Sequence, residues 1–377
     1  MFKDSFCSSP WFHIRITYNG DFVPCRWQIR NKNEQNFSDT SIMSFYNSEQ
    51  MKNLRMGLLA GNEPSNCAEC YYSDKHSKLS GRIKQLNKSG VMMDHFDLSL
   101  RSSPHYELFK YSQENDGESL YYPVDLQIDL GNTCNSACIM CHPFASSRLH
   151  QDYKKLNKID VMFEYPKEYT SWTKDPEKLN KFADQIAELP HIRYIHFLGG
   201  ETLYDEAFYT LCERLIENGM SKHIIVGTTT NGTVYNSRIE NLIRNFKEFH
   251  LGISIESVTD LNDYIRYPSN VANIKHNLLQ FLNLRKTTAL HTTLRITPNI
   301  FSVYYIDSLF DFMLEHDVIG ESCNILTSPA QLRIELLPED IRQEIVNKLK
   351  RFEHQASGEV NIRRPDLSNT IIKDLIA

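Results

Sequence analysis

From residue 122 onward, strand patterns and helix patterns alternate along the chain, and this alternation limits the possible folds more than any other feature. Apolar residues at every second position predict strands over residues 124–130, 193–198, 223–229, 249–255, 289–297 and 323–326. Helical spacing predicts helices over residues 178–189, 205–218, 237–246, 273–284, 306–316 and from 338 onward. Six strand–helix units in series predict a parallel sheet with right-handed crossovers, as an open barrel or a doubly wound sheet. In both folds the active site lies at the carboxyl ends of the strands.

The composition argues against two classes of function. The formal charge is −6, whereas nucleic-acid-binding proteins normally carry a strong basic excess. The most basic stretch, residues 75–88, has Leu79, Ile83 and Leu86 at helical spacing, so we interpret it as a solvated helix face rather than a polyanion site. No apolar run approaches the ~18 residues of a membrane span, and residues 1–10 lack the apolar core of a signal peptide. We therefore expect a cytoplasmic protein with reduced thiols and with no nucleic-acid or membrane partner.

Three cysteines fall within eight residues, directly after the first predicted strand. Cys134, Cys138 and Cys141 provide three soft thiolates that can bind one metal centre. A structural zinc ion normally takes four protein ligands, and the adjacent His142 could be the fourth, so a zinc site stays open as an alternative. Three thiolates on a [4Fe–4S] cluster would instead leave one iron available for a substrate or cofactor.

Four more cysteines lie in residues 1–100, around a predicted hairpin and helix. Cys7 precedes the hairpin, whose turn is Asn19-Gly20, and Cys25 follows it. A helix with Met51, Leu54 and Leu58 on one stripe is predicted to end at Gly61, before Cys67 and Cys70. Four cysteines can close an iron–sulfur cluster or a zinc site, and both readings stay open here. Residues 101–121 are polar without clear periodicity and are interpreted as a linker. The last two cysteines, Cys212 and Cys323, stand alone and are expected to be buried.

The Cys-x₃-Cys-x₂-Cys loop after the first strand resembles the signature of the radical S-adenosylmethionine (SAM) superfamily. The resemblance implies an α/β fold with a partial (β/α)6 TIM-like barrel over residues 122–330. It also implies a [4Fe–4S] cluster on Cys134, Cys138 and Cys141, whose open iron chelates the amino and carboxylate groups of SAM. Reductive cleavage of SAM then gives a 5′-deoxyadenosyl radical, which abstracts a hydrogen atom from the substrate.

The same resemblance implies which residues contact SAM, since polar motifs follow successive predicted strands. A Gly-Gly-Glu motif follows the second strand, a polar turn follows the third, and a Ser and an Arg follow the fourth. A methionine stands where the family usually has an aromatic residue, just before the third cysteine. The residues implied are Met140, Gly199, Gly200, Glu201, Asn231, Ser254, Glu256 and Arg266. In isolation, each also has a structural reading, such as a capping acid for Glu201 or a surface salt bridge for Arg266. No catalytic acid or base can be named, and residues 144–172 are a candidate lid.

The N-terminal cysteines resemble those of the SPASM and twitch auxiliary-cluster domains, in which a hairpin and a helix precede a Cys-x₂-Cys pair. One Cys-x₂-Cys pair matches the shorter twitch form, with a single [4Fe–4S] cluster on Cys7, Cys25, Cys67 and Cys70. Relatives usually carry this small α+β iron–sulfur module after the barrel, whereas here it comes first. The resemblance implies a twitch domain over 1–100, a linker over 101–121, the barrel over 122–330 and a C-terminal helical extension over 331–377.

These features together predict a radical SAM enzyme, most simply an oxidoreductase that dehydrogenates a carbohydrate-like alcohol. The alternative is radical modification of a peptide or protein by crosslinking, epimerisation or oxidation. A lesser alternative is a non-catalytic iron–sulfur redox partner, which would need the cysteines but not the SAM-contacting residues. The expected partners are a small-molecule or peptide substrate and an electron donor of the flavodoxin or ferredoxin type.

Overall fold

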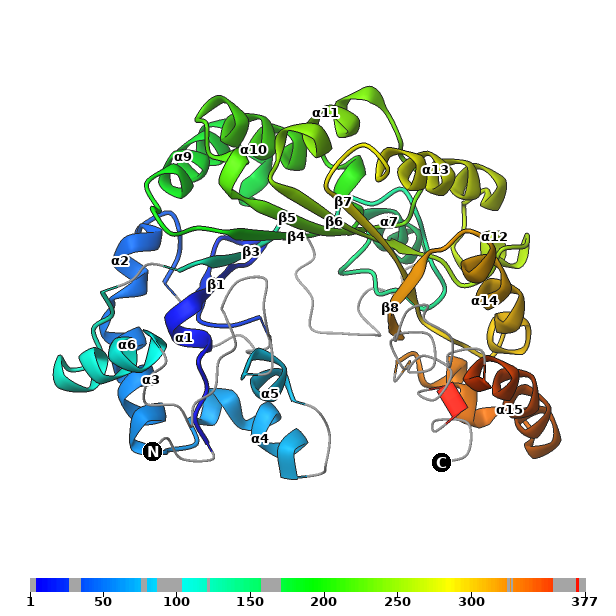
Figure 1. Ribbon diagram of the computed structural model, residues 1–377, viewed down its shortest axis with the longest axis horizontal. Helices are drawn as coiled ribbons and strands as arrows, with labels where there is room; N and C mark the ends of the chain where they lie inside the picture. Colours follow the sequence, from blue (N-terminus) through cyan, green and yellow to red (C-terminus); the bar gives the residue numbers. More distant parts are fainter. Residues whose placement is uncertain are drawn as a thin grey trace. The chain divides into compact units, whose positions relative to one another are not determined.

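The computed structural model describes residues 5–26, 35–75, 80–86, 104–120, 123–156, 171–323, 326, 328–354 and 371–372. The chain, drawn in Figure 1 with its helices and strands labelled, divides into two compact units. Unit 1 comprises Met1–Leu130, Thr170–Phe197 and Thr210–Val226, and unit 2 comprises Gly131–Tyr169, Leu198–Tyr209 and Gly227–Ala377. No helix among the described residues has the length and apolar character that crossing a membrane requires.

Eight strands form a sheet in the order β2-β1-β3-β4-β5-β6-β7-β8. They are β1 (His13–Ile16), β2 (Phe22–Val23), β3 (Asp125–Asp129), β4 (Tyr194–Leu198), β5 (Ile225–Thr230), β6 (Glu248–Ser254), β7 (Leu290–Ile296) and β8 (Ile319–Cys323). β1 pairs in parallel with β3, as β6 does with β7 and β7 with β8, whereas β1 and β2 are antiparallel. The predicted α/β fold with a parallel sheet is therefore confirmed.

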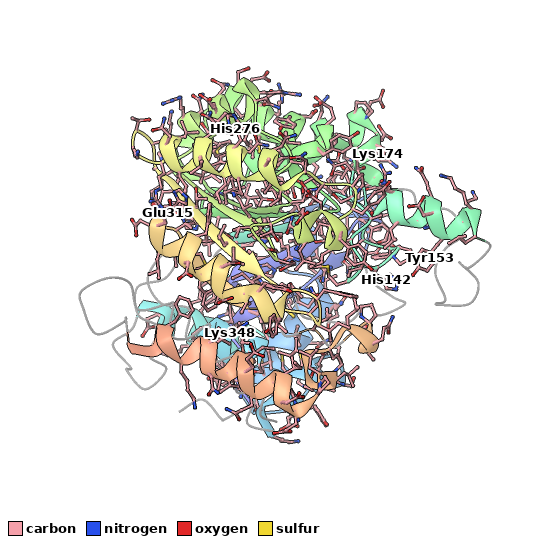
Figure 2. All side chains as sticks on the ribbon, turned by 90° about the vertical axis from the view of Figure 1, so that its right-hand side faces the viewer. His142, Tyr153, Lys174, His276, Glu315 and Lys348 are labelled. Atoms are coloured by element: carbon pink, nitrogen blue, oxygen red, sulfur yellow. The ribbon has the colours of Figure 1, made fainter. Side chains whose placement is uncertain are left out.

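Unit 2 has strands that are apolar on one face and polar on the other. Phe249, Leu251 and Ile253 of β6 are buried, while the alternating residues His250 and Ser254 are half-buried. The helices of this unit are α7 (Ser147–Lys155), α11 (Ser237–Asn245), α12 (Leu261–Ile265), α13 (Val271–Leu284), α14 (Ile306–Glu315) and α15 (Glu339–His354). Helices α13, α14 and α15 face the viewer in Figure 2, where His276, Glu315 and Lys348 are labelled. Helix α10 (Glu206–Glu217) begins in this unit.

The last strand begins earlier than predicted. The sequence predicts it over residues 323–326, whereas β8 spans Ile319–Cys323, and residues 324 and 325 of the prediction lie outside the described residues. Helix α14 ends at Glu315, and the chain turns at Asp317, whose φ is +47°. Val318 is fully buried, and pairing with β7 begins at the next residue, Ile319, directly after the turn.

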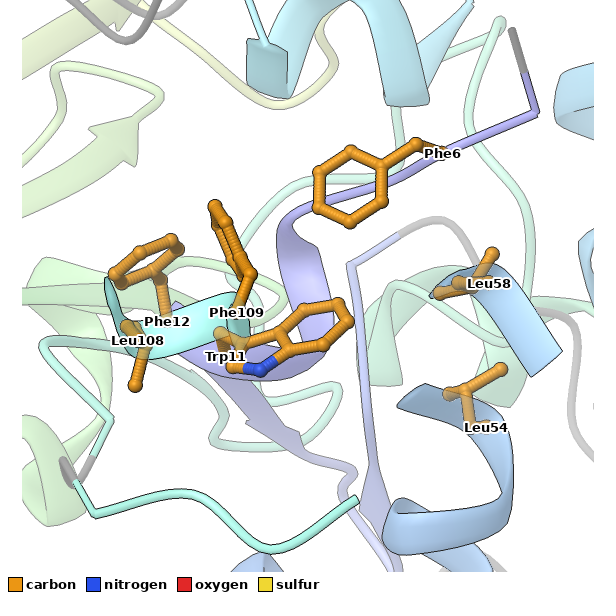
Figure 3. Packing of buried hydrophobic residues seen from close by; sticks show 7 residues of the cluster. All are labelled: Phe6, Trp11, Phe12, Leu54, Leu58, Leu108 and Phe109. Carbon is orange, nitrogen blue, oxygen red and sulfur yellow. The ribbon is translucent and has the colours of Figure 1, made fainter. Parts of the chain in front are cut away.

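Unit 1 has an aromatic core that fixes the N-terminal segment. Its main helices are α1 (Ser9–Phe12), α2 (Ile42–Tyr46), α3 (Glu49–Ala60), α4 (Ala68–Lys75), α5 (Gly81–Leu86), α6 (Pro104–Glu114) and α9 (Pro176–Ala187). The core cluster shown in Figure 3 consists of Phe6, Trp11, Phe12, Leu54, Leu58, Leu108 and Phe109. Trp11 packs edge-on against Phe109 at 5.0 Å, and its Nε1 donates to Ser112 Oγ at 2.9 Å. The segment interpreted as a linker therefore contains helix α6, which contributes to this core. The domain boundaries themselves remain predictions.

The predicted hairpin and the end of the predicted helix are confirmed. Strands β1 and β2 pair across a turn in which Gly20 has φ +91°, a conformation that glycine adopts without strain. Helix α3 ends at Gly61, also left-handed with φ +83°. On α3, the fully buried Arg55 donates hydrogen bonds to the carbonyls of Pro10, Tyr46 and Gly117, so one guanidinium joins three segments.

Candidate cofactor and cluster sites

The loop with three cysteines is held against the N-terminus of α7. The Cys134 amide donates to Ser147 Oγ at 3.1 Å, and the Ser147 hydroxyl donates back to the Cys134 carbonyl at 3.2 Å. Ser146, the N-cap of α7, donates to the Ser136 carbonyl at 2.5 Å. The Ser136 amide in turn points at Cys134 Sγ at 3.4 Å. The two serines therefore fix the loop around its first cysteine.

The middle of the loop is held by the segment after α12. The Ala137 amide donates to the Tyr267 carbonyl at 2.5 Å, and the Ile139 amide donates to the Ile265 carbonyl at 2.9 Å. These bonds flank Cys138, which is 8% exposed. The backbone of Cys138 is accordingly fixed on both sides.

The three thiols lie close enough to raise one another's pKa. Burial is the largest cause and raises the pKa of Cys134 to about 12, with Cys138 and Cys141 adding to the shift. Burial also raises the pKa values of Cys138 and Cys141, and Cys138 adds to the shift of Cys141, whereas Arg266 opposes both shifts. Three buried thiolates side by side repel one another unless a cation neutralises them, and thiolates are the ligands of iron–sulfur clusters. The donor set therefore fits the predicted cluster.

His142, the alternative fourth ligand of a zinc site, has its Nδ1 engaged. That nitrogen accepts a hydrogen bond from the Phe144 amide at 3.2 Å, which places the proton of the neutral ring on Nε2. Burial also lowers the pKa of His142. A metal bond through Nε2 would require the other tautomer, so this bond disfavours the zinc reading.

Gly200 has no room for a side chain. A Cβ at this position would lie 2.6 Å from the carbonyl oxygens of both Asn132 and Thr133. The following residue, Glu201, donates its amide to the Thr133 carbonyl at 2.8 Å. The Gly-Gly-Glu motif therefore packs backbone to backbone against the start of the cysteine loop.

The Glu201 carboxylate is buried and accepts three hydrogen bonds. Oε1 accepts from Thr230 Oγ1 at 2.5 Å and from the Leu203 amide at 3.1 Å, and Oε2 accepts from the Asn231 amide at 2.5 Å. Burial raises the pKa of Glu201 from 4.5 to about 7, although these three donors act in the opposite direction. Glu201 therefore fixes the end of β5 against the loop after β4, in which Glu201 itself lies.

Asn231 joins the end of β5 to the cysteine loop. Its Nδ2 donates to Asn135 Oδ1 at 2.8 Å and to Ser136 Oγ at 3.0 Å. Its Oδ1 accepts from the amide and hydroxyl of Thr233 at 3.0 and 2.7 Å. The predicted SAM contacts Gly200, Glu201 and Asn231 are thus brought together with the cysteines.

Glu256 and Arg266 form an ion pair in the interior. Glu256 is fully buried, and the side chain of Arg266 is 12% exposed. The second carboxylate oxygen of Glu256 accepts from the Thr297 amide at 2.8 Å, and Arg266 Nη1 lies 3.9 Å from Cys138 Sγ. Burial disfavours a charged guanidinium, but Glu256 and the nearby thiols outweigh this, so the pKa of Arg266 is raised. The surface-salt-bridge reading of Arg266 is therefore wrong.

Three further predicted SAM contacts, Ser254, Met140 and Gly199, have fewer contacts that fix their positions. Ser254 is the last residue of β6, half-buried and in register with Arg295 of β7. Met140, directly before Cys141, is also half-buried. Gly199 follows β4 and precedes the tightly packed Gly200.

The four N-terminal cysteines gather in unit 1. Cys7 follows Phe6, Cys25 follows β2, Cys67 ends a short 3₁₀ helix (Ser65–Cys67), and Cys70 lies in α4. Burial is the largest cause of a raised pKa for Cys7, and the other three thiols raise it further. The pKa of Cys67 is raised to about 12 by burial and by Cys25 and Cys70. Four mutually coupled thiols fit a fully ligated metal centre.

Two polar side chains hold the backbone that leads into Cys7. Arg82 donates to the Phe6 carbonyl at 3.0 Å, and its other nitrogens pair with Asp74 at 2.6 and 2.8 Å. The Tyr71 hydroxyl donates to the Ser5 carbonyl at 2.9 Å. The Cys25 segment is anchored as well, since the next residue, Arg26, pairs at 2.9 Å with a buried aspartate of β3.

Comparison with known families decides the identity. Residues 128–297 match the family model described as the radical SAM superfamily, and residues 7–71 match that of SPASM, an iron–sulfur cluster-binding domain. These matches show a radical SAM domain and an iron–sulfur cluster-binding SPASM domain in this chain. The two matches confirm the cofactors predicted for this radical SAM protein, namely SAM, a [4Fe–4S] cluster that binds it and an auxiliary cluster.

Solved structures resemble the chain at low identity. One is "Native anSMEcpe with bound AdoMet", with 15% identity, a TM-score of 0.43 and coverage of 62% of this chain and 61% of that chain. Another is SuiB of Streptococcus suis bound to S-adenosylmethionine, with 12% identity, a TM-score of 0.42 and coverage of 96% and 72%. The chain spans about three fifths of the length of the first of these. No curated protein matches this radical SAM protein. The identity therefore rests on the two family matches.

Sequence reasoning missed the residues that support the cysteine loop. Ser146 and Ser147 were not singled out, although each bonds to the cysteine loop. The bonds from Asn135 to Thr233 and from Thr230 to Glu201 were not predicted either. Ser146 could have been found as the N-cap of a helix, since serine is a favoured cap. The other three bonds join residues on different loops, which a single sequence does not reveal.

Proposed function

We propose that this protein reductively cleaves SAM at a [4Fe–4S] cluster held by Cys134, Cys138 and Cys141. The observation that carries the proposal is the position of these thiols, which gather beside the buried Arg266 and the tightly packed Gly200. When bound, SAM supplies a 5′-deoxyadenosyl radical after one-electron reduction, and this radical takes a hydrogen atom from the substrate.

The surrounding residues bind and orient the cofactor. The backbone of Gly199 and Gly200 allows close approach, and Glu201 and Asn231 hold that backbone against the cysteine loop. Arg266 and Ser254 would hold the SAM carboxylate, while Glu256 keeps the guanidinium charged and fixed in the interior. Met140 would pack against the adenine as a polarizable side chain.

The N-terminal module holds a second [4Fe–4S] cluster on Cys7, Cys25, Cys67 and Cys70. Four thiolates leave no open iron, which favours electron transfer over ligand binding. We propose that this cluster accepts the electron left on the substrate after hydrogen abstraction. The substrate then loses one hydrogen atom, one electron and one proton in total, a two-electron oxidation. The proposal includes the domains predicted from the sequence: the twitch domain over 1–100, a linker over 101–121, the barrel over 122–330 and the helical extension over 331–377.

We further propose that the enzyme is a cytoplasmic oxidoreductase acting on a carbohydrate-like alcohol, with a flavodoxin or ferredoxin as electron donor. The polar row of Ser254, Thr293 and Arg295 on β6 and β7 offers hydrogen-bonding groups to a hydroxyl-rich substrate. A peptide substrate is the second candidate, since an auxiliary cluster can accept an electron from a peptide radical as well as from an alcohol radical. Reduced thiols and iron–sulfur clusters agree with a cytoplasmic setting.

The test is 5′-deoxyadenosine formation by the reduced protein incubated with SAM. The wild type should form it, and Cys138→Ala should form none, because the loss of one ligand removes the cluster. Cys212→Ala is the matched control, since Cys212 is buried on α10 outside both cysteine groups, and it should behave as the wild type. Wild-type protein with a full complement of iron that forms no 5′-deoxyadenosine would overturn the proposal.

The role of the second cluster is tested by a variant with Cys67→Ala and Cys70→Ala. Wild-type protein should hold about eight Fe and eight sulfide per chain, and this variant about four. It should still form 5′-deoxyadenosine, but the substrate should regain hydrogen from solvent, detected as deuterium after reaction in D₂O. Normal product formation would mean that the second cluster is structural. Zinc retained stoichiometrically in a variant that lacks Cys134, Cys138 and Cys141 would overturn the assignment of an iron–sulfur cluster to Cys7, Cys25, Cys67 and Cys70. Panels of sugars and of short peptides, each assayed for increased 5′-deoxyadenosine, distinguish the two substrate classes.

A further inference from the structure

Two histidines and a glutamate meet on the polar face of β6 and β7, within unit 2. His250 and His291 are paired in the register of the two parallel strands, so both side chains project from the same face. Glu248 precedes His250 by two residues and shares that face. The sheet itself, rather than a flexible loop, therefore brings the three residues together.

The ligand atoms have the spacing of a transition-metal site. Glu248 Oε2 lies 3.2 Å from His250 Nε2 and 3.6 Å from His291 Nε2. All three atoms lie within 4.8 Å of one another. A tetrahedral zinc ion with bonds of about 2.0–2.2 Å requires ligand atoms about 3.3–3.6 Å apart. The two imidazole rings cross nearly perpendicularly, at 76°, with centroids 4.9 Å apart.

We propose that Glu248, His250 and His291 bind one divalent transition-metal ion. Imidazole and carboxylate ligands suit zinc and its neighbours in the first transition series, whereas the cysteine groups provide sulfur for iron–sulfur clusters. Three protein ligands leave at least one position for water, as in open zinc sites. Glu248, His250 and His291 are 29%, 33% and 61% exposed, so an ion can enter from solvent.

The site is separate from the proposed SAM site. Along β6, His250 lies four residues before Ser254, roughly 13 Å at the rise of a strand. The metal site is therefore at the amino-terminal part of the strands, whereas the cysteine loop and its supporting residues follow strand ends. Binding of the ion requires neither SAM nor an assembled cluster. The proposed metal site and the proposed SAM cleavage can therefore be tested independently.

Equilibrium dialysis of the anaerobically purified protein against Zn²⁺, with zinc and iron measured in each sample, tests the proposal. Wild type should hold one zinc per chain more than His291→Ala, at equal iron content. Glu248→Gln should weaken this zinc at least about tenfold, because it removes the charged ligand. His276→Ala is the control, since His276 is an exposed histidine on helix α13, and it should keep wild-type zinc.

Zinc bound to empty cysteine sites contributes equally to the wild type and to every variant, so it cancels when the zinc content of a variant is subtracted from that of the wild type. His291 is 61% exposed, so its replacement should leave the thermal unfolding midpoint of the zinc-free protein within about 2 °C. Equal zinc in the wild type and in His291→Ala, with both proteins folded, would overturn the proposal.

Discussion

Arg266 contacts both Glu256 and Cys138: its Nη2 pairs with the Glu256 carboxylate, and its Nη1 lies 3.9 Å from the Cys138 sulfur. Glu256 is fully buried, so the pair lies in the interior. A guanidinium in this place neutralises one buried carboxylate and also favours the thiolate that the cluster requires. The same side chain therefore supports both the fold and the proposed cofactor site.

Replacing Arg266 by alanine should destabilise the protein by about 3–5 kcal/mol, because Glu256 would remain buried without its partner. Urea unfolding followed by circular dichroism measures this. Arg285→Ala is the control, since Arg285 pairs with an exposed aspartate and should contribute less than about 1 kcal/mol. Arg266→Lys should fold, yet bind SAM roughly ten- to a hundredfold more weakly at unchanged iron content, because lysine lacks the guanidinium fork. Unchanged SAM binding by Arg266→Lys would argue against a contact with the SAM carboxylate.

Gly200→Ala should abolish the cluster of the three-cysteine loop. The added methyl group would lie 2.6 Å from two backbone oxygens, so the loop must move as a whole. Iron analysis should fall from about eight to about four Fe per chain. Gly57→Ala is the matched control, because Gly57 lies in helix α3 with its nearest neighbour 3.9 Å from the added atom. Full iron content in Gly200→Ala would show that the loop does not depend on this contact.

Arg82→Ala should selectively weaken the auxiliary cluster. It removes the hydrogen bond to the Phe6 carbonyl, one residue before Cys7, and leaves Asp74 without its partner. We expect loss of about four Fe per chain while 5′-deoxyadenosine is still formed. Arg238→Ala, which breaks an ion pair with the exposed Glu206, should retain all the iron. If Arg82→Ala keeps eight Fe, the anchoring role of Arg82 is wrong.

The stability of the protein should depend on pH through Glu201. Burial raises the pKa of this carboxyl from 4.5 to about 7, so the folded state holds the proton more tightly than the unfolded chain does. The resulting stabilisation is complete below about pH 4.5 and is lost as the pH rises to about 7. The free energy of unfolding of wild type minus that of Glu201→Gln should therefore fall by up to about 3 kcal/mol across this range. Urea titrations of iron-free protein measure it, and a constant difference would contradict the raised pKa.

The sequence predicted most of the helices and strands because their periodicity is strong. Strand β6 and helices α9 and α13 lie within two residues of their predicted ends. Helix α6 was missed since it is mostly polar, and the buried pair Leu108 and Phe109 gives too little periodicity to detect.

The site could be predicted only in part. The cysteines and the Gly-Gly-Glu motif are local patterns, and their positions after strands follow from the parallel fold. The pairing of Arg266 with Glu256 and the alignment of His250 with His291 depend on tertiary geometry and strand register. His250 and His291 are 41 positions apart in the sequence, so periodicity places each on a polar face without showing that they meet.

The most direct test of the central claim is the electron paramagnetic resonance spectrum of the reduced protein before and after addition of SAM. The account predicts that SAM changes the signal of the cluster on Cys134, Cys138 and Cys141, because one of its irons is open. The variant with all three replaced by alanine should keep only the auxiliary signal, and SAM should leave that signal unchanged. A wild-type spectrum insensitive to SAM, or an auxiliary signal that shifts with SAM in the triple variant, would contradict the assignment of the two cysteine groups.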